Sequence, residues 1–250
     1  MISLKTPEQI KLMREAGRIT GEALLLAGEQ VKPGVSTKHL DDVIRDYIEK
    51  CGARPSFLGL YGFPGSACIS LNDQVIHGIP SKDVIIREGD LVKIDVGACK
   101  NGFHGDSART FACGNVSEEA MQLLRVTRES FYKGLEQVRV GGRLGDIGAA
   151  IQAHAESFGY GVVRDFVGHG VGRSVHESPD VPNYGRAGHG LRLQAGMVIA
   201  IEPMINAGTY KVRTLEDGWT VKTLDGSLSS HYEHTVAITD DGPVLLTKAD

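Results

Sequence analysis

Acidic residues placed beside apolar runs are the feature that most constrains how this chain can fold. Three acids adjoin such runs: Asp95 after residues 91–94, Glu202 after residues 198–201 and Glu233 before residues 235–238. A carboxylate that is buried without a partner is costly enough that the group takes up a proton instead. These acids and Asp106 have too few Lys or Arg partners within the same segments. A pair of divalent metal ions would supply the missing positive charge.

Composition narrows the class of protein. With 250 residues, 41% of them hydrophobic, the chain can bury a large core, and its net charge of −4 gives no bulk attraction to nucleic acid or to an anionic membrane. The four cysteines form no CxxC pair, which favours reduced thiols in a reducing compartment. No signal peptide and no apolar run of about 20 residues is visible, so we expect a soluble cytoplasmic protein.

Two pairs of helices are expected. Thr6, Pro7 and Gln9 have the spacing of a capping box that opens a first helix, and a second helix should span about 37–50 before Gly52. A second pair is expected at about 117–139 and 146–158. Residues 57–80 are expected to form strand and loop, and further strands are expected near 197–205, 219–224 and 231–239, with a glycine-rich loop at 168–172.

Residues 90–112 predict a β-hairpin whose turn is Asn101-Gly102. If these two residues are central in the turn, the numbers of cross-strand partners sum to 203. Asp95 then faces Ala108 and Asp106 faces Gly97. Asp95 and Asp106 become diagonal neighbours on one face, within reach of a shared ion. A register slip of one residue would separate them.

The two halves of the chain resemble each other at an offset of 107 residues. The segment VKPG at 31–34 aligns with VRVG at 138–141, Gly89 aligns with Gly196, and Asp95 aligns with Glu202. An internal duplication would therefore place one carboxylate at the same point of each half. We predict one domain spanning 1–250, of the α+β class, with a pseudo-twofold duplication and a curved antiparallel sheet covered by two helix pairs.

Several short motifs carry the chemistry. They are NDQVIHGIP at 72–80, DVG at 95–97, GDSART at 105–110, GHGVG at 168–172, HE at 176–177, IEP at 201–203 and YEHT at 232–235. In order and spacing this set resembles the type I methionine aminopeptidases, metallopeptidases of family M24 with the pita-bread (creatinase/aminopeptidase-like) fold. The resemblance runs from the first helix to the final strand.

The resemblance implies a site for two divalent ions, with the ligands Asp95, Asp106, His169, Glu202 and Glu233. Asp106 and Glu233 would bridge both ions. A set rich in oxygen with one imidazole suits Co, Mn, Fe(II) or Zn, and the native metal stays open. Glu202 would also carry a proton from water to the leaving amine, while His77 would contact the substrate and His176 would stabilise the tetrahedral intermediate.

The family pattern also implies a narrow apolar pocket for an unbranched thioether side chain. Its candidate lining residues are Tyr61, Phe63, Cys68, His77 and Trp219. Phe57, Leu60 and Val175 stand where related enzymes often carry other residues. His234 should point to the opposite face of its strand from Glu233 and have a structural role. His231 receives no assigned role.

The implied activity is hydrolytic removal of the initiator methionine from nascent proteins, mainly when the second residue is small. The implied partners are nascent N-termini, with transient association with the ribosome and a monomeric state as further expectations. One alternative is a prolidase or Xaa-Pro aminopeptidase of the same fold, although those enzymes usually carry a large N-terminal domain. Another is a non-enzymatic binding protein that reuses the fold, although such proteins typically lose metal ligands.

Overall fold

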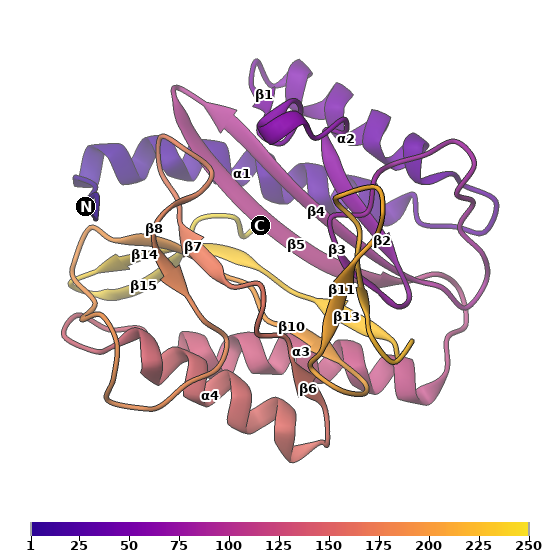
Figure 1. Cartoon of the computed structure of the whole chain (residues 1–250). Helices are drawn as coiled ribbons and strands as arrows, with labels where there is room; N and C mark the ends of the chain where they lie inside the picture. The colour runs from indigo at the N-terminus through magenta and orange to yellow at the C-terminus, as the bar shows by residue number, and fades with distance from the viewer. Residues whose placement is uncertain (1, 250) are drawn as a thin grey trace.

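A layer of strands lies between two helix pairs in the computed structural model of the chain, which describes residues 2–249 (Figure 1). One pair is α1 (Pro7–Glu29) and α2 (Thr37–Lys50), and the other is α3 (Glu118–Leu135) and α4 (Leu144–Ser157). Among the described residues, no helix combines the length and apolarity needed to cross a membrane.

The helix starts follow local capping. The hydroxyl of Thr6 accepts a hydrogen bond from Gln9 N, and the side chain of Gln9 accepts one from Thr6 N, which confirms the predicted capping box. Ser36 and Ser117 cap α2 and α3 with their side chains. The apolar faces of α1 and α2 pack on the strands of the first half, and those of α3 and α4 pack on the strands of the second half.

The strands pair in antiparallel ladders that divide into four sheets. In chain order they are β1 (Arg54–Pro55), β2 (Ala67–Leu71), β3 (Gln74–Ile76), β4 (Leu91–Lys100), β5 (Phe103–Ala112), β6 (Gly161–Val162), β7 (Gly168–Gly170), β8 (Glu177–Val181), β9 (Val198–Ile201), β10 (Met204–Asn206), β11 (Val212–Thr214), β12 (Val221–Thr223), β13 (Ser229–His231), β14 (His234–Thr239) and β15 (Gly242–Leu245). A short 3₁₀ turn covers Leu60–Gly62.

The predicted hairpin register is confirmed. Strands β4 and β5 pair Asp95 with Ala108 and Gly97 with Asp106. The turn forms because Asn101 and Gly102 both adopt positive φ, at 55° and 74°, as a tight hairpin turn requires. The two carboxylates therefore stand on the same face of the hairpin.

The duplication is visible in the backbone. Helices α2 and α4 have the same length, and their bounds differ by 107 residues. The isolated bridge between Ser36 and Ile85 recurs between Arg143 and Arg192 at the same offset. Gly89 and Gly196 both adopt a φ of 88°. Each half therefore repeats one helix pair and a glycine turn, followed by the strand that carries Asp95 in the first half and the strand that precedes Glu202 in the second.

Hydrogen bonds across a central seam join the two halves. The hydroxyl of Thr235 accepts from Asp106 N at 2.9 Å and donates to Asp106 O at 2.8 Å. Glu233 N donates to Ala108 O at 2.8 Å, and the hydroxyl of Ser107 donates to Glu233 O at 2.7 Å. This seam places β5 of the first half beside the segment that carries Glu233 in the second.

Two expectations require correction. The glycine-rich segment at 168–172 was expected to be a loop, but Gly168 and Gly170 belong to strand β7. A Cβ on Gly168 would lie 2.3 Å from Ala200 O, so the glycine allows close approach of strands and not loop flexibility. Helix α3 ends at Leu135, earlier than predicted, because Val138 leaves the helical path and packs in the core.

Candidate metal centre

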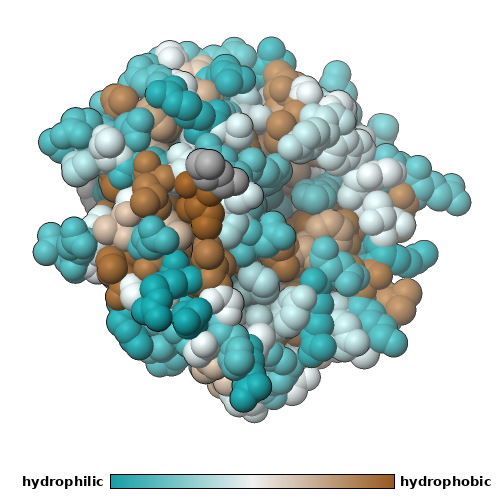
Figure 2. Space-filling view, turned by 60° about the vertical axis from the view of Figure 1, so that its left-hand side comes forward, coloured by the Kyte–Doolittle hydropathy of each residue, from teal (hydrophilic) through white to brown (hydrophobic). Residues whose placement is uncertain are grey.

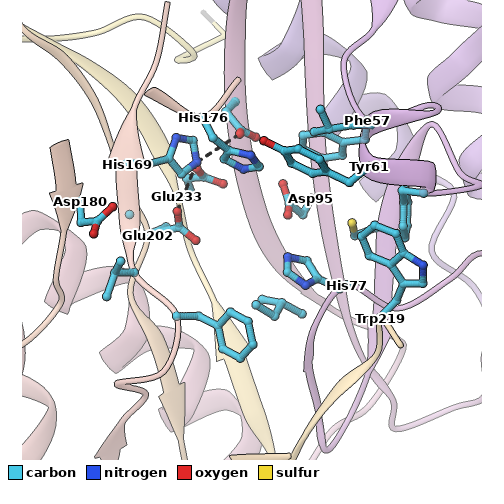
Figure 3. A pocket seen from close by; sticks show the side chains of 18 residues that line it. Phe57, Tyr61, His77, Asp95, His169, His176, Asp180, Glu202, Trp219 and Glu233 are labelled. Carbon is cyan, nitrogen blue, oxygen red and sulfur yellow. Dashed lines mark ion pairs between the residues drawn. The ribbon is translucent and has the colours of Figure 1, made fainter. Parts of the chain in front are cut away.

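The five predicted ligands converge in one cavity of about 380 Å³ between the two halves (Figure 3). Their side-chain donor atoms form overlapping groups whose members all lie within 4.8 Å of one another. One group joins Asp95, Asp106 and Glu233, and a second joins His169, Glu202 and Glu233. The two groups share Glu233, as two neighbouring cation positions with a bridging carboxylate would require.

Three of the predicted ligands lie on strands, and the other two lie directly beside strands. Asp95 and Asp106 lie on the paired strands β4 and β5, and His169 lies on β7. Glu202 directly follows β9, and Glu233 lies between β13 and β14. Both halves therefore contribute to the centre, and the duplication places Asp95 and Glu202 at equivalent points of the two halves.

The carboxyl groups create a strongly unfavourable cluster of like charge. Burial raises the pKa of Asp95 to about 7 and that of Glu202 to about 8. Burial and the neighbouring carboxylates raise the pKa values of Asp106 and Glu233 well above their ordinary range. The four acids can be ionised together only if positive charge compensates them.

His169 is held in the state in which an imidazole binds a metal. Its Nδ1 lies 2.9 Å from the carbonyl oxygen of Gly170, which can only accept, so Nδ1 carries the proton. Its Nε2 then presents a lone pair 3.6 Å from Asp106 Oδ2 and 3.5 Å from Glu202 Oε1. Burial, followed by the nearby His176, lowers the pKa of His169 to about 4, so the ring is neutral at pH 7.

The buried carboxylate oxygen atoms show whether a cation fits among the five predicted ligands. Asp95 Oδ1, Asp106 Oδ1 and Glu233 Oε1 have no hydrogen-bond partner among residues 2–249. A buried carboxylate oxygen without a partner costs free energy unless a cation or a hydrogen-bond donor meets it. Hard oxygen atoms with one imidazole are the donors that divalent first-row metals accept, so the residues fit metal ions.

His77 and His176 flank the predicted ligands, and His176 forms a third group with Asp106 and His169 whose donor atoms also lie within 4.8 Å of one another. The ring centroids of His169 and His176 are 4.4 Å apart. His77 adopts a φ of 59°, which is rare for a residue with a side chain, and it faces the cavity directly after β3. Such a backbone conformation is typical of a position fixed by function. Burial, together with His231 and His176, lowers the pKa of His77 to about 4.

An apolar pocket adjoins the ligands. Phe63 and Cys68 are buried, and the Phe63 ring meets Trp219 edge to face with centroids 5.1 Å apart. Phe57 and Leu60 line the same cavity. Tyr61 is 78% exposed and stacks on His176 at the mouth, with ring centroids 6.2 Å apart.

Val175 packs in the cluster of Phe57, Phe63 and Cys68, so it contributes behind the pocket wall. His234 is buried on the other side of its strand, with Nδ1 2.8 Å from the Thr247 hydroxyl, which confirms its predicted direction.

Two residues near the ligand cluster were not assigned to the site from the sequence. His231 is buried, with Nε2 3.6 Å from Glu202 Oε2, and neither ring nitrogen has a hydrogen-bond partner among the described residues. The spacing of two between His231 and Glu233 was the signal that both face the same side of an extended segment. Asp180 on β8 also lines the cavity, and no sequence motif marked it.

Comparison with known proteins identifies the family to which the chain belongs. The model of metallopeptidase family M24 matches residues 11–240. A methionine aminopeptidase from Clostridium perfringens is 59% identical over 247 residues, 99% of each chain. Methionine aminopeptidase 1 from Bacillus subtilis is 50% identical over 248 residues, which are 99% of this chain and all of the relative.

A solved methionine aminopeptidase structure resembles this chain more closely than a solved prolidase structure does. A methionine aminopeptidase from Thermotoga maritima superposes with a TM-score of 0.98 at 43% identity, covering 99% of this chain and 100% of the other. A prolidase from Pyrococcus furiosus gives a TM-score of 0.79 at 26% identity, covering 99% of this chain and 66% of the prolidase. The chain therefore belongs to metallopeptidase family M24 and, within it, to the methionine aminopeptidases.

Proposed function

We propose that this protein hydrolyses the first peptide bond of polypeptides that begin with methionine, mainly when the second residue is small, and that residues 1–250 act as one catalytic domain. The observation that carries this proposal is the position of the apolar pocket of Phe63, Cys68 and Trp219 directly beside the carboxylate–histidine cluster. A methionine side chain in that pocket brings the adjoining carbonyl group to the cluster.

We propose that the centre holds two divalent ions. Asp95, Asp106 and Glu233 would hold one, and His169, Glu202 and Glu233 the other, with Asp106 close enough to His169 to serve both positions. When bound, such ions lower the pKa of a coordinated water and polarise a carbonyl group. Co, Mn, Fe(II) and Zn all suit this donor set.

The chain's own residues position the substrate and move the proton. Glu202 accepts a proton from the attacking water as the carbon–oxygen bond forms. It then donates that proton to the leaving nitrogen as the carbon–nitrogen bond breaks. His77 hydrogen-bonds the substrate beside its scissile amide, and His176 donates to the oxygen that gains negative charge.

We propose nascent polypeptides as the substrates, met in the cytoplasm through transient contact with the ribosome, and a monomer as the working form. A non-enzymatic binding role is disfavoured because the chain has a residue able to bind a metal at each of the five ligand positions, and all five side chains converge on one cavity. The prolidase alternative is disfavoured by the lower structural similarity to a prolidase.

A metal-reconstitution assay tests the proposal. The chelated protein, reloaded with Co, Mn, Fe(II) or Zn, is given Met-Ala-Ser, Leu-Ala-Ser and Ala-Pro-Ala. We expect metal-dependent cleavage of Met-Ala-Ser alone. Cleavage of Ala-Pro-Ala would indicate the prolidase activity instead, and the absence of cleavage with every metal would indicate a binding protein.

A further inference from the structure

A second groove continues from the catalytic cavity. It has a volume of about 630 Å³ and shares Asp180 with the cavity that holds the ligand cluster. Figure 3 places Asp180 beside Glu202, on the side of the cluster away from Trp219. A substrate whose first side chain fills the pocket at Trp219 would therefore pass Glu202 and Asp180 to reach this groove.

Part of the groove wall is apolar. Its walls come from β8, the loop that follows β8 and the start of α4, and they include Leu144, Pro182, Tyr184 and Leu191. Leu144 is buried, and Pro182, Tyr184 and Leu191 are partly exposed. Figure 2 brings forward the side of the molecule that lies on the left in Figure 1 and shows a group of hydrophobic residues on that face. Hydrophobic residues grouped around a hollow on a surface are typical of a site that binds a partner chain.

Asp180 gives the junction of cavity and groove a negative charge. The side chains that line the catalytic cavity include no Lys or Arg. With two divalent ions bound, the four ligand carboxylates (−4) and the ions (+4) cancel, and the charge of Asp180 remains. Asp180 is exposed and forms no ion pair among residues 2–249. Arg186 and His189 line the groove but not the cavity.

We propose that this groove binds the substrate chain downstream of the scissile bond, and that Asp180 selects a Lys or Arg a few residues after the leaving methionine. The inference rests on the proposed aminopeptidase function and extends it from the first two residues to a longer segment. Continuity with the catalytic cavity argues for this occupant, because a chain held at the ligand cluster must leave the cavity. An extended chain advances about 3.3 Å per residue, so a few residues reach from the cluster into the groove.

Matched peptides test the inference. Met-Ala-Lys-Ala-Leu-Ala and Met-Ala-Glu-Ala-Leu-Ala differ only in the charge at position three, and further pairs move the charge to positions four and five. We expect kcat/KM to favour Lys over Glu by about three- to fivefold at one of these positions at low salt, and the ratio to approach one at high salt. We expect Asp180→Asn to bring the ratio of kcat/KM for the Lys and Glu peptides to about one. The matched control Asp241→Asn, in the exposed turn between β14 and β15, should keep it.

A second comparison tests the apolar part of the groove. Replacing Leu with Ser in the same hexapeptide should raise KM about two- to fivefold for the wild type. Leu191→Ser should remove most of that difference, with thermal unfolding used to verify that the variant folds. Equal rates for all hexapeptides would overturn the inference. If Leu191→Ser changes the sedimentation coefficient of the protein and the peptide sequence has no effect on KM, the inference is overturned. The groove would then be a contact with a second copy of the chain.

The tripeptide separates this inference from the function on which it rests. If Met-Ala-Ser is cleaved but the hexapeptide ratios equal one, the groove inference fails and the aminopeptidase proposal stands. If Met-Ala-Ser is not cleaved with any metal, the aminopeptidase proposal itself fails.

Discussion

Lys5 Nζ lies 2.6 Å from Glu177 Oε2, which joins the segment before α1 to the first residue of β8. The other oxygen of Glu177 accepts from the backbone N–H groups of Arg173 and Ser174 at 2.7 and 3.2 Å. Glu177 also directly follows His176. The N-terminal segment therefore fixes the loop that positions one of the two proposed catalytic histidines.

The Lys5–Glu177 pair should make stability depend on pH. Desolvation raises the pKa of Glu177, but the hydrogen bond from Lys5 and those from the backbone together lower it below its ordinary value. A lowered folded-state pKa means that the stabilisation is present above the unfolded pKa, about 4.3, and is lost as pH falls through the folded value.

We therefore expect Glu177→Gln to reduce the free energy of unfolding by about 2–3 kcal/mol at pH 7 and by progressively less below about pH 4.5. Urea unfolding of the metal-free protein and of the variant between pH 7 and 3 measures the difference. A difference that grows toward low pH would have the wrong sign.

Glu202→Gln should lower kcat by about 100- to 10,000-fold, with a much smaller change in KM, because the amide cannot accept the proton of water. Steady-state kinetics on Met-Ala-Ser measure both constants. Metal analysis of the same preparation is the control, because Glu202 also belongs to a ligand group. Turnover at the wild-type level would remove Glu202 from proton transfer.

Metal removal should destabilise the folded protein. Bound ions would compensate the four carboxylates, so metal at about 100 times its Kd should add about 2.7 kcal/mol per bound ion to the free energy of unfolding. Calorimetric titration of the chelated protein should give two ions per chain, and Asp95→Asn should reduce this number to one. A single ion in the unaltered protein would contradict the two-ion proposal.

Gly17→Ala should destabilise the protein although alanine favours helices. A Cβ at Gly17 would lie 2.3 Å from the carbonyl oxygen of Leu246, so α1 would have to move away from the C-terminal segment. We expect a loss of about 1–3 kcal/mol in the free energy of unfolding. Lys11→Ala on the exposed side of α1 is the matched control and should change it by less than about 0.5 kcal/mol.

Much of the site could be predicted from sequence because its parts are local. The turn at Asn101-Gly102 fixes the register of β4 and β5, and that register alone brings Asp95 and Asp106 to one face. The 107-residue offset predicted that Glu202 occupies in the second half the position that Asp95 occupies in the first. Asp180 and the contact of His231 with Glu202 were not predicted. Both depend on where β8, β9 and β13 lie relative to one another, and long-range packing decides that.

The role of Gly168 was misread for a related reason. Glycine signals a loop when only local conformational freedom is considered, but here its missing side chain lets β7 lie against the Ala200 carbonyl. Sequence pattern reports backbone freedom, whereas the closeness of a neighbouring strand appears only once the chain has folded.

The seam between Asp106 and Thr235 links enzymatic competence to the completion of folding. A chain in which only the first half has formed holds Asp95 and Asp106 but lacks His169, Glu202 and Glu233. Such an intermediate lacks three of the five proposed ligands, so we expect it to have no peptidase activity. Division of the proposed ligands between two repeats would thus confine peptidase activity to chains in which both halves have docked.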